Sequence, residues 1–207
     1  MSESSPNRKA AMEQRRCSIL HAARAVFARQ GYADTVVDDI ASQAGIAKGT
    51  LYLYFPSKEK IYSAALLEEA RQLDADSRAA MGAASSWREK LGAYLQVRIR
   101  YFETHQDFLR IYMTEFRGMC MQGKPFAAEF IHLVHEGEAQ LAQMFAAAAA
   151  RGEIRQVDPE LAALTVSDIS RGLMERQLRG WGRPVGSADA AFAFDVLCRS
   201  LSVVPNC

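Results

Sequence analysis

Long apolar runs are missing from this sequence of 207 residues. No stretch approaches the roughly 18 consecutive apolar residues that a membrane-spanning helix needs. The first residues, MSESSPNRKAAMEQRR, are polar, whereas a secretory signal peptide carries an apolar segment near its start. We therefore expect a cytoplasmic protein that does not enter a membrane.

Cysteine is scarce, and its spacing does not match the usual metal-binding or redox motifs. No C-x-x-C pair is present among the four cysteines, Cys17, Cys120, Cys198 and Cys207. In a cytoplasmic protein we expect such thiols to be reduced and to pack as small apolar side chains. A redox switch stays open as an alternative, because it depends on a lowered thiol pKa that a sequence does not reveal.

Catalytic motifs are also missing. The sequence contains no G-x-S-x-G, no phosphate-binding P-loop, no G-x-G-x-x-G and no pair of carboxylates in an apolar setting. His132 and His135 lie one helical turn apart, but their order, H-x-x-H-E, differs from the zinc-binding H-E-x-x-H. We therefore expect no enzyme activity, no metal and no cofactor.

Charge is distributed unevenly, although the whole chain carries only +1. Residues 1–60 hold nine Lys or Arg and six Asp or Glu, a net charge of +3, which leaves −2 for the remaining residues. Affinity for nucleic acid is therefore expected in the N-terminal quarter. We predict a disordered basic arm over residues 1–12, which either adds phosphate contacts or only aids solubility.

Residues 35–60, TVVDDIASQAGIAKGTLYLYFPSKEK, have the pattern of two short helices around a tight turn. Thr35 and Asp38 match the S/T-x-x-D/E start of a helix, and Gly45 stands where a helix end needs a left-handed residue. The second helix is expected from Ala47 to about Leu53, with Ser57 capping a third. Apolar residues at helical spacing form the inner faces of the two helices: Val36, Val37, Ile40, Ala41, Ala44, Leu51 and Phe55.

The outer face of the second helix has an unusual composition. A solvated helix face is normally filled with Glu, Lys and Gln, whereas this one presents Lys48, Gly49, Thr50, Tyr52 and Tyr54. These groups suit phosphate oxygens and base edges in a major groove, and a glycine lets backbone approach backbone. We also predict phosphate contacts by Thr35 and by Lys58 at the start of the third helix. The alternative is a small three-helix core whose tyrosines merely cover apolar surface.

The same residues resemble the DNA-binding signature of the tetracycline-repressor (TetR) family, A-x-x-A-G-[IV]-x-x-G-T-L-Y-x-Y-F-x-S-K-E. The signature residues in this sequence are Ala41, Ala44, Gly45, Ile46, Gly49, Thr50, Leu51, Tyr52, Tyr54, Phe55, Ser57, Lys58 and Glu59. An amphipathic first helix that stops at Gly31-Tyr32 agrees with it; its apolar residues are Ile19, Ala22, Ala23, Val26 and Phe27. Many relatives carry His in place of Tyr54, which affects the detail of one contact. The resemblance implies a helix-turn-helix domain that binds double-stranded DNA.

The rest of the chain contains helical periods separated by Gly, Pro and Ser, and no strand pattern. Capping signals stand at Ser86 with Glu89, and at Asp158-Pro159-Glu160. We expect further helices over about 58–80, from 86, and over about 107–120, 126–151, 159–178 and 187–203. The predicted fold is all-α, with a helix-turn-helix DNA-binding domain at 13–60, a connecting helix and linker at 61–84, and a helical bundle for ligand binding and dimerisation at 85–207.

The last two predicted helices carry more apolar surface than one side can bury. We expect this hairpin to pair with its copy across a two-fold axis as a four-helix bundle, as the family does; packing within one monomer is the alternative. A homodimer would meet two half-sites of a palindromic operator. The apolar residues of the hairpin are Leu161, Leu164, Ile169, Gly172, Leu173, Ala190, Phe192, Phe194, Leu197, Cys198 and Leu201.

The middle helices are rich in aromatic residues and methionine, a composition that suits either an effector pocket or an ordinary core. The candidates for contact with a hydrophobic or aromatic small molecule are Phe108, Tyr112, Phe116, Met119, Phe130, His132, Arg171 and Glu175. The resulting prediction is a homodimeric transcriptional regulator, a repressor that such an effector releases from DNA. The alternative is a DNA-binding repressor without a small-molecule effector, controlled by a protein partner or by redox state.

Overall fold

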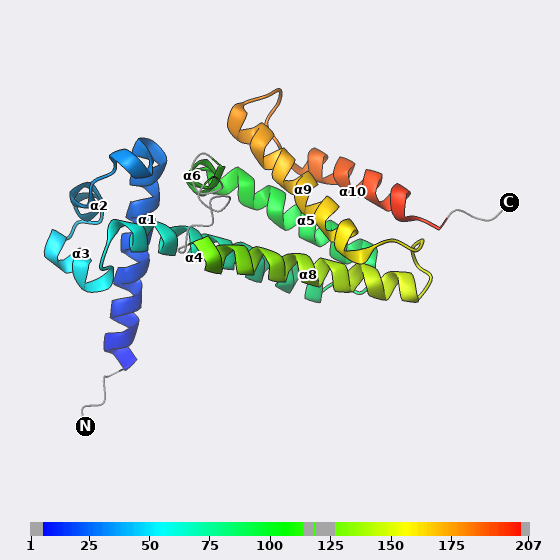
Figure 1. Ribbon diagram of the computed structural model, residues 1–207, viewed down its shortest axis with the longest axis horizontal. Helices are drawn as coiled ribbons and strands as arrows, with labels where there is room; N and C mark the ends of the chain where they lie inside the picture. Colours follow the sequence, from blue (N-terminus) through cyan, green and yellow to red (C-terminus); the bar gives the residue numbers. More distant parts are fainter. Residues whose placement is uncertain (1–5, 114–117, 119–126, 204–207) are drawn as a thin grey trace. The chain divides into compact units, whose positions relative to one another are not determined.

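The computed structural model describes residues 6–113, 118 and 127–203, and within these residues every regular element is helical, which confirms the all-α prediction (Figure 1). The chain divides into two compact units, one of Met1–Glu69 with Arg110–Glu129, the other of Ala70–Leu109 with Phe130–Cys207. The helices are α1 (Pro6–Asp34), α2 (Val37–Gln43), α3 (Lys48–Tyr54), α4 (Lys58–Gly82), α5 (Trp87–Thr104), α6 (Gln106–Ile111), α8 (Ala128–Ala150), α9 (Pro159–Arg179) and α10 (Ser187–Leu201).

In the first unit, α1, α2, α3 and the start of α4 surround a small apolar core. An aromatic cluster lies at its centre, where the ring of Tyr62 is 4.9 Å from that of Phe27 and 4.7 Å from that of Tyr32. Gly31 has φ 78, a value that L side chains rarely adopt, so the regular part of α1 ends there as predicted. The predicted inner faces of α1 to α3 supply the buried Ile19, Ala22, Ala23, Val26, Phe27, Ile40, Ala41, Leu51 and Phe55. Val36, also predicted on an inner face, is 54% exposed, because it holds the extended N-cap position of α2 and lies outside the helical period.

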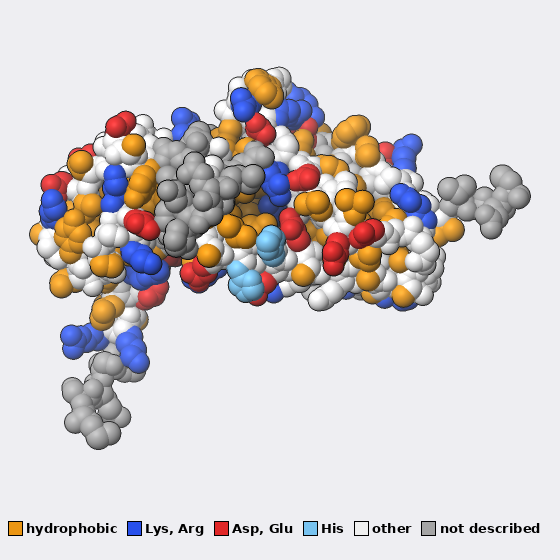
Figure 2. Space-filling view, in the orientation of Figure 1, with side chains coloured by type: hydrophobic (Ala, Val, Ile, Leu, Met, Phe, Trp, Pro, Cys, Tyr) orange, Lys and Arg blue, Asp and Glu red, His pale blue; other side chains and the backbone are white. Residues whose placement is uncertain are grey.

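Two further predictions about this unit are wrong. The arm predicted to be disordered over residues 1–12 is helical from Pro6 onward, because the residues after Pro6 include good helix formers and no further Gly or Pro. Thr35 does not cap α2: Val36 holds the N-cap position without a side-chain hydrogen bond, and the Thr35 hydroxyl donates instead to the carbonyl of Gly31 at 2.6 Å. Figure 2 shows basic side chains near the start of α1.

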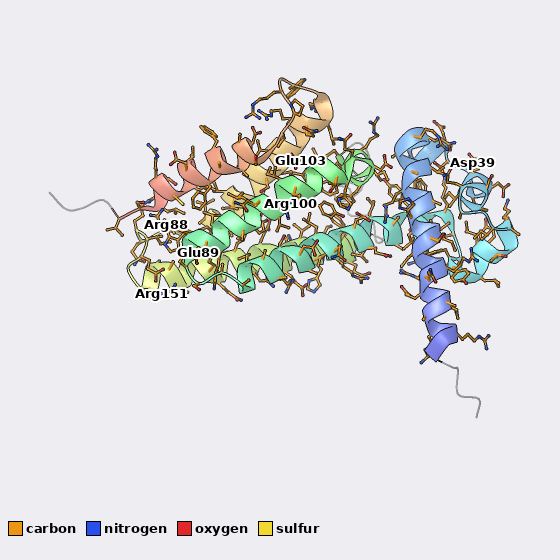
Figure 3. The ribbon with its side chains drawn as sticks, turned by 180° about the vertical axis from the view of Figure 1, so that it is seen from behind. Asp39, Arg88, Glu89, Arg100, Glu103 and Arg151 are labelled. Atoms are coloured by element: carbon orange, nitrogen blue, oxygen red, sulfur yellow. The ribbon has the colours of Figure 1, made fainter. Side chains whose placement is uncertain are left out.

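The second unit is a bundle of the later part of α4 with α5, α8, α9 and α10. Its predicted helix starts are confirmed. Ser86 and Glu89 form the capping box of α5 (Glu89 in Figure 3). At the start of α9, the Asp158 side chain accepts hydrogen bonds from two backbone N–H groups. One continuous core runs through the bundle and includes Met81, Trp87, Leu91, Tyr94, Leu141, Phe145, Ala163, Val166, Ala193 and Leu197. The helix predicted over about 107–120 is found as α6, and its later part lies largely outside the described residues. None of the helices in the described ranges combines the length and apolarity needed to cross a lipid bilayer.

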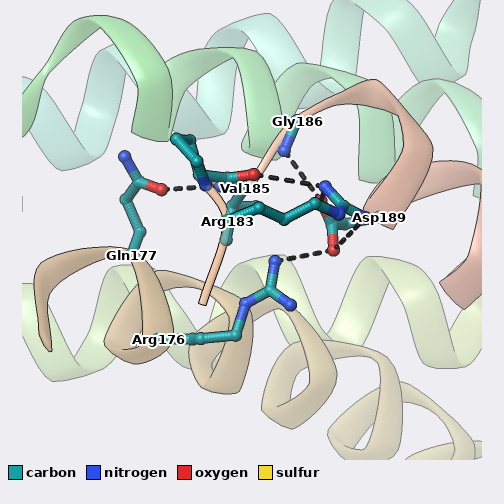
Figure 4. A network of polar contacts seen from close by, with 7 residues as sticks. Arg176, Gln177, Arg183, Val185, Gly186 and Asp189 are labelled. Atoms are coloured by element: carbon teal, nitrogen blue, oxygen red, sulfur yellow. Dashed lines mark hydrogen bonds and ion pairs between the residues drawn. The ribbon is translucent and has the colours of Figure 1, made fainter. Parts of the chain in front are cut away.

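A buried carboxylate fixes the turn between α9 and α10 (Figure 4). Asp189 accepts from Arg176 at 2.7 Å, from Arg183 at 2.8 Å and from the backbone N–H of Gly186 at 2.9 Å. Burial raises the pKa of Asp189, but the Gly186 hydrogen bond and the two guanidinium groups outweigh it and hold the pKa below its ordinary value. The ionised carboxylate therefore stabilises this hairpin.

Replacing Asp189 should cost stability in a pH-dependent way. Asp189→Asn is expected to lower the free energy of unfolding by about 1–3 kcal/mol at neutral pH, because charge-assisted hydrogen bonds are lost. A pKa that is lowered on folding stabilises above the unfolded pKa, and this stability disappears as pH falls through the folded pKa. Denaturant unfolding between pH 7 and pH 3 should show the difference shrinking. Asp168→Asn, an exposed control on α9, should show little effect, and a pH-independent loss for Asp189→Asn would contradict the assignment.

Candidate nucleic-acid interface

Buried contacts hold α3 from one side only. Leu51 and Phe55 point into the core of the first unit, and the N–H of Phe55 donates to Leu51 at 3.0 Å to close the last turn. The preceding turn depends on Gly45, whose φ of 65 is left-handed, with the N–H of Ile46 donating back to Ala41 at 3.0 Å. The helix-turn-helix prediction is confirmed, and it leaves the opposite face of α3 open.

That open face carries the residues predicted to approach DNA. Lys48 and Gly49 are exposed, Tyr52 is 43% exposed, and Thr50 and Tyr54 are half-buried. A Cβ atom placed on Gly49 would meet no heavy atom within 4 Å, and Gly49 has no positive φ. The fold therefore does not require glycine at this position.

An exposed leucine also lies on α3 and was not among the outer residues predicted from the sequence. Leu53 is 84% exposed, the largest exposed fraction among the large apolar side chains described. Its place two residues after the buried Leu51 and two before the buried Phe55 could have revealed it, since side chains two apart on a helix point to different sides. Figure 2 shows hydrophobic side chains gathered on the surface over α2 and α3. Such groups suit the methyl groups of thymine.

Lys48 is held at the edge of this face by an acid of α2. Its Nζ lies 3.0 Å from one carboxylate oxygen of Asp38 and donates to the other at 3.1 Å. The hydrogen bond to Asp38 and its negative charge raise the pKa of Lys48. Both side chains are exposed, so the pair is screened by solvent and is available for exchange with a phosphate oxygen.

Two residues predicted to contact phosphates are engaged inside the unit. Lys58 Nζ donates to three backbone carbonyls, those of Tyr32 at 2.7 Å, Ala33 at 3.2 Å and Thr35 at 2.9 Å, and lies 4.6 Å from the Tyr32 ring. The three donors of the ammonium group are thereby used. Thr35 is 1% exposed and its hydroxyl is bonded to Gly31. Lys58 thus joins the end of α1 to the start of α4, whereas the Thr35 side chain is bonded to the end of α1. Both side chains are engaged inside the unit, where the sequence predicted phosphate contacts.

Ion pairs also occupy two other arginines of this unit. Arg24 of α1 lies 2.6 Å from Glu69 of α4, with both side chains largely buried, and Arg16 lies 3.2 Å from Glu68. Both pairs hold α1 against α4. Within the described residues, Arg8, Lys9, Arg15 and Arg29 are exposed and form no ion pair. The basic surface available to a polyanion is therefore smaller than the sequence charge suggests.

The described residues predicted to contact an effector comprise an aromatic set, buried or half-buried, and a polar set that forms ion pairs. Phe108 and Phe130 are buried and Tyr112 is half-buried, whereas Phe116 and Met119 lie outside the described residues. The polar candidates pair with neighbours along or between helices: His132 with Glu136 at 3.4 Å, Arg171 with Asp168 at 2.7 Å and Glu175 with Arg179 at 2.8 Å. Among the residues described, no group of three His, Cys, Asp or Glu could hold a metal.

The predicted dimer hairpin divides into a buried and an exposed set. Ala190, Leu197, Cys198 and Leu201 pack inside the second unit. Four large apolar residues of α9 and α10 face outward: Leu161, Leu164, Phe192 and Val196. Figure 2 shows hydrophobic side chains at the surface over α9, with acidic ones beside them. Leu161 and Leu164 also line an open groove between α8 and α9, which extends this apolar surface.

Two family models match the chain. The model described as bacterial regulatory proteins of the tetR family matches residues 19–65, and a tetracyclin repressor-like C-terminal domain matches residues 84–188. The transcriptional activator FasR of Mycolicibacterium smegmatis is 32% identical over 108 residues, which are 50% of this chain and 49% of that protein. The regulator SrpR of Pseudomonas putida is 34% identical over 83 residues, 40% of this chain and 39% of that protein. The chain thus spans half or less of the length of these curated relatives.

Solved structures share the fold over nearly the whole chain. Bacillus subtilis FadR, determined in complex with stearoyl-CoA, aligns with a TM-score of 0.79 and 21% identity, covering 87% of this chain and 96% of that one. The ketosteroid regulator KstR2 of Mycobacterium tuberculosis aligns with a TM-score of 0.72 and 22% identity, covering 92% and 96%. At these identities the likeness concerns the fold.

Lys48 and Lys58 should respond differently to the same substitution. Lys48→Gln is expected to weaken binding to every duplex and to reduce the slope of log affinity against log salt by about one. Lys58→Gln should leave that slope unchanged and lower the free energy of unfolding by about 1–3 kcal/mol, because three carbonyls lose their donor. Fluorescence anisotropy at several salt concentrations and denaturant unfolding measure both. A reduced slope for Lys58→Gln would contradict its structural assignment.

Removing the acid that holds Lys48 should strengthen DNA binding. Asp38→Asn frees the ammonium group and removes a negative charge, so affinity should rise about two- to fivefold at low salt, the value of one exposed ion pair. Asp39→Asn is the matched control: it removes the same charge from α2 (Figure 3) but from a residue that does not contact Lys48. Equal gains for both variants would show that overall charge, and not the Lys48 contact, is responsible.

Proposed function

Because the chain belongs to the TetR family of bacterial regulatory proteins, we propose that it represses transcription from a palindromic operator as a homodimer and leaves that operator when a small, largely apolar effector binds. The observation that carries the proposal is the one-sided burial of α3. Its inner residues are fixed in the core, whereas Lys48, Gly49 and Tyr52 on its outer face are exposed.

The outer face of α3 fits the major groove in size and chemistry. A single helix enters that groove, and Lys48, Thr50 and Tyr52 offer donors and acceptors to phosphates and base edges. Leu53 offers an apolar contact to thymine methyl groups, and Gly49 allows the helix backbone to lie close to the duplex. Tyr54 is half-buried at the end of α3, and its hydroxyl would donate to a phosphate in this arrangement.

A homodimer is supported by the exposed apolar set of α9 and α10. Phe192 is 72% exposed and Leu161 is 61% exposed, and large apolar residues at a monomer surface are typical of interfaces. A two-fold axis across this hairpin would form a four-helix bundle and cover the groove between α8 and α9. The dimer would carry two copies of α3 to two half-sites on one side of a duplex.

Release by an effector requires unequal binding to two states of the dimer. The first part of α4 belongs to the DNA-binding unit and its last part to the bundle. A shift of the bundle would therefore be transmitted through one continuous helix. A coupling of about 1–3 kcal/mol would suffice. The complex of the structurally similar FadR with stearoyl-CoA supports a long apolar effector for this chain.

Redox control, the other part of the alternative, finds no support in the described cysteines. Burial and the carboxylate of Glu68 raise the pKa of Cys17, and burial raises the pKa of Cys198. Both thiols therefore stay protonated at neutral pH, whereas oxidation starts from the thiolate. Control by a protein partner stays the alternative to a small effector.

A charge in the dimer surface should separate the protomers without unfolding them. Phe192→Asp would bury two carboxylates in a symmetric interface, at a cost of several kcal/mol, so the dimer dissociation constant should rise by roughly a hundredfold or more. Sedimentation velocity should then show a monomer, and operator affinity should fall with it. Met12→Asp, an equally apolar and exposed site on α1, should leave the dimer intact. A Phe192→Asp protein that sediments as a dimer would place the interface elsewhere.

A further inference from the structure

Arg98 of α5 is a cation for which the second unit provides no anion among the described residues. Its guanidinium carbon lies 5.3 Å from the centre of the Tyr94 ring and 5.8 Å from that of Phe102. These rings stand one turn before and one turn after it on the same face of α5, and both are buried. The Nε atom is inaccessible to solvent and has no hydrogen-bond partner within the part of the chain that the structure describes.

The other arginines of this unit show how unusual this is. Nearly all of them donate to a carboxylate or another oxygen: Arg78, Arg88, Arg151, Arg155, Arg171, Arg176, Arg179, Arg183 and Arg199. Arg71 also has a partner. Arg100 has none among the described residues, but it is exposed and therefore solvated by water (Figure 3). Within the described part of this unit, Arg98 alone combines partial burial with the lack of an oxygen partner.

The fold gains little from such a residue. Two aromatic rings attract the cation, but they leave the buried Nε–H without an acceptor, and an unsatisfied buried donor is destabilising. A methionine or leucine would fill the same space between two buried rings without that cost. An arginine in this place is therefore explained by something that binds to it from outside the chain.

We propose that Arg98 binds an oxyanion, a carboxylate or a phosphate, at the end of an apolar ligand. Arginine is suited to this task because its donors form a fixed fork that matches both groups. Tyr94 belongs to the apolar core of the bundle, so a ligand tail beside it would contact apolar side chains while its charged end meets the guanidinium. The inference rests on the proposed effector and specifies its chemistry: an amphipathic anion, and not a neutral hydrophobic compound.

Calorimetric titration with three probes of equal tail length tests this proposal on the full chain. Nonanoate, octyl phosphate and octanol share an octyl tail and differ only in the end group. The wild-type protein should bind at least one anion about 10- to 100-fold more tightly than octanol, as expected for a hydrogen bond to a charged group. Which anion binds more tightly distinguishes a carboxylate from a phosphate ligand. Arg98→Gln should lose this preference, and Arg100→Gln, the neighbouring unpaired arginine, should keep it.

If Arg98 served only to stabilise the fold, its replacement should destabilise the unliganded protein. If the arginine serves a ligand, Arg98→Met should unfold at the same denaturant concentration as wild type or a higher one. Equal affinity for the three probes, binding of none of them, an anion preference that survives in Arg98→Gln, or a clear loss of stability in Arg98→Met would each overturn the proposal.

Operator release is measured separately with the same probes. If an anion binds through Arg98 but leaves the protein on its duplex, the Arg98 site stands and the proposed effector control fails. If octanol releases the duplex as well as either anion does, effector control stands and the Arg98 proposal fails.

Discussion

In the first unit, the short helix α3 depends on contacts with its neighbours, because it is too short to be stable alone. Seven residues form barely two turns, and isolated helices of this length do not persist in water. α3 is helical because Leu51 and Phe55 are buried against α1 and α2, and because Lys58 fixes the start of α4 to the end of α1. All of this support comes from one side. The opposite side is thereby left free for a partner, and its backbone geometry is already fixed before binding.

Much of this arrangement could be predicted from local patterns. Helical periods predicted most of the inner faces of α1 to α3, with Val36 as the exception. Capping signals at Ser86 and Asp158 predicted the starts of α5 and α9, because caps are decided by residues within one turn. Lys58 could not be assigned in this way. Its partners precede it by 23 to 26 residues, and only the folded chain brings them to its ammonium group. The prediction that Thr35 caps α2 was wrong, because its hydroxyl donates to the carbonyl of Gly31 instead.

The basic residues divide into those that hold the fold together and those that it leaves available. Arg24, Lys58 and the two arginines around Asp189 join helices and loops. Lys48 is restrained only by an exposed ion pair, and Arg98 has no oxygen partner among the described residues. Lys48 is hydrated and suits a polyanion such as DNA, whereas Arg98 lies between buried rings and suits a small amphipathic anion. Under the proposed function, Lys48 would contact the operator and Arg98 the effector.

Selection of duplexes from a random pool, without any small molecule, tests most directly whether the exposed face of α3 reads DNA as a symmetric pair. The full chain should enrich an inverted repeat whose half-sites lie about one helical turn, roughly 34–36 Å, or a multiple of it apart. Gly49→Glu should abolish the enrichment without loss of stability, because the added side chain has free space in the protein but would block the groove. No enrichment by the wild-type chain, or unchanged enrichment by Gly49→Glu, would contradict this function for α3.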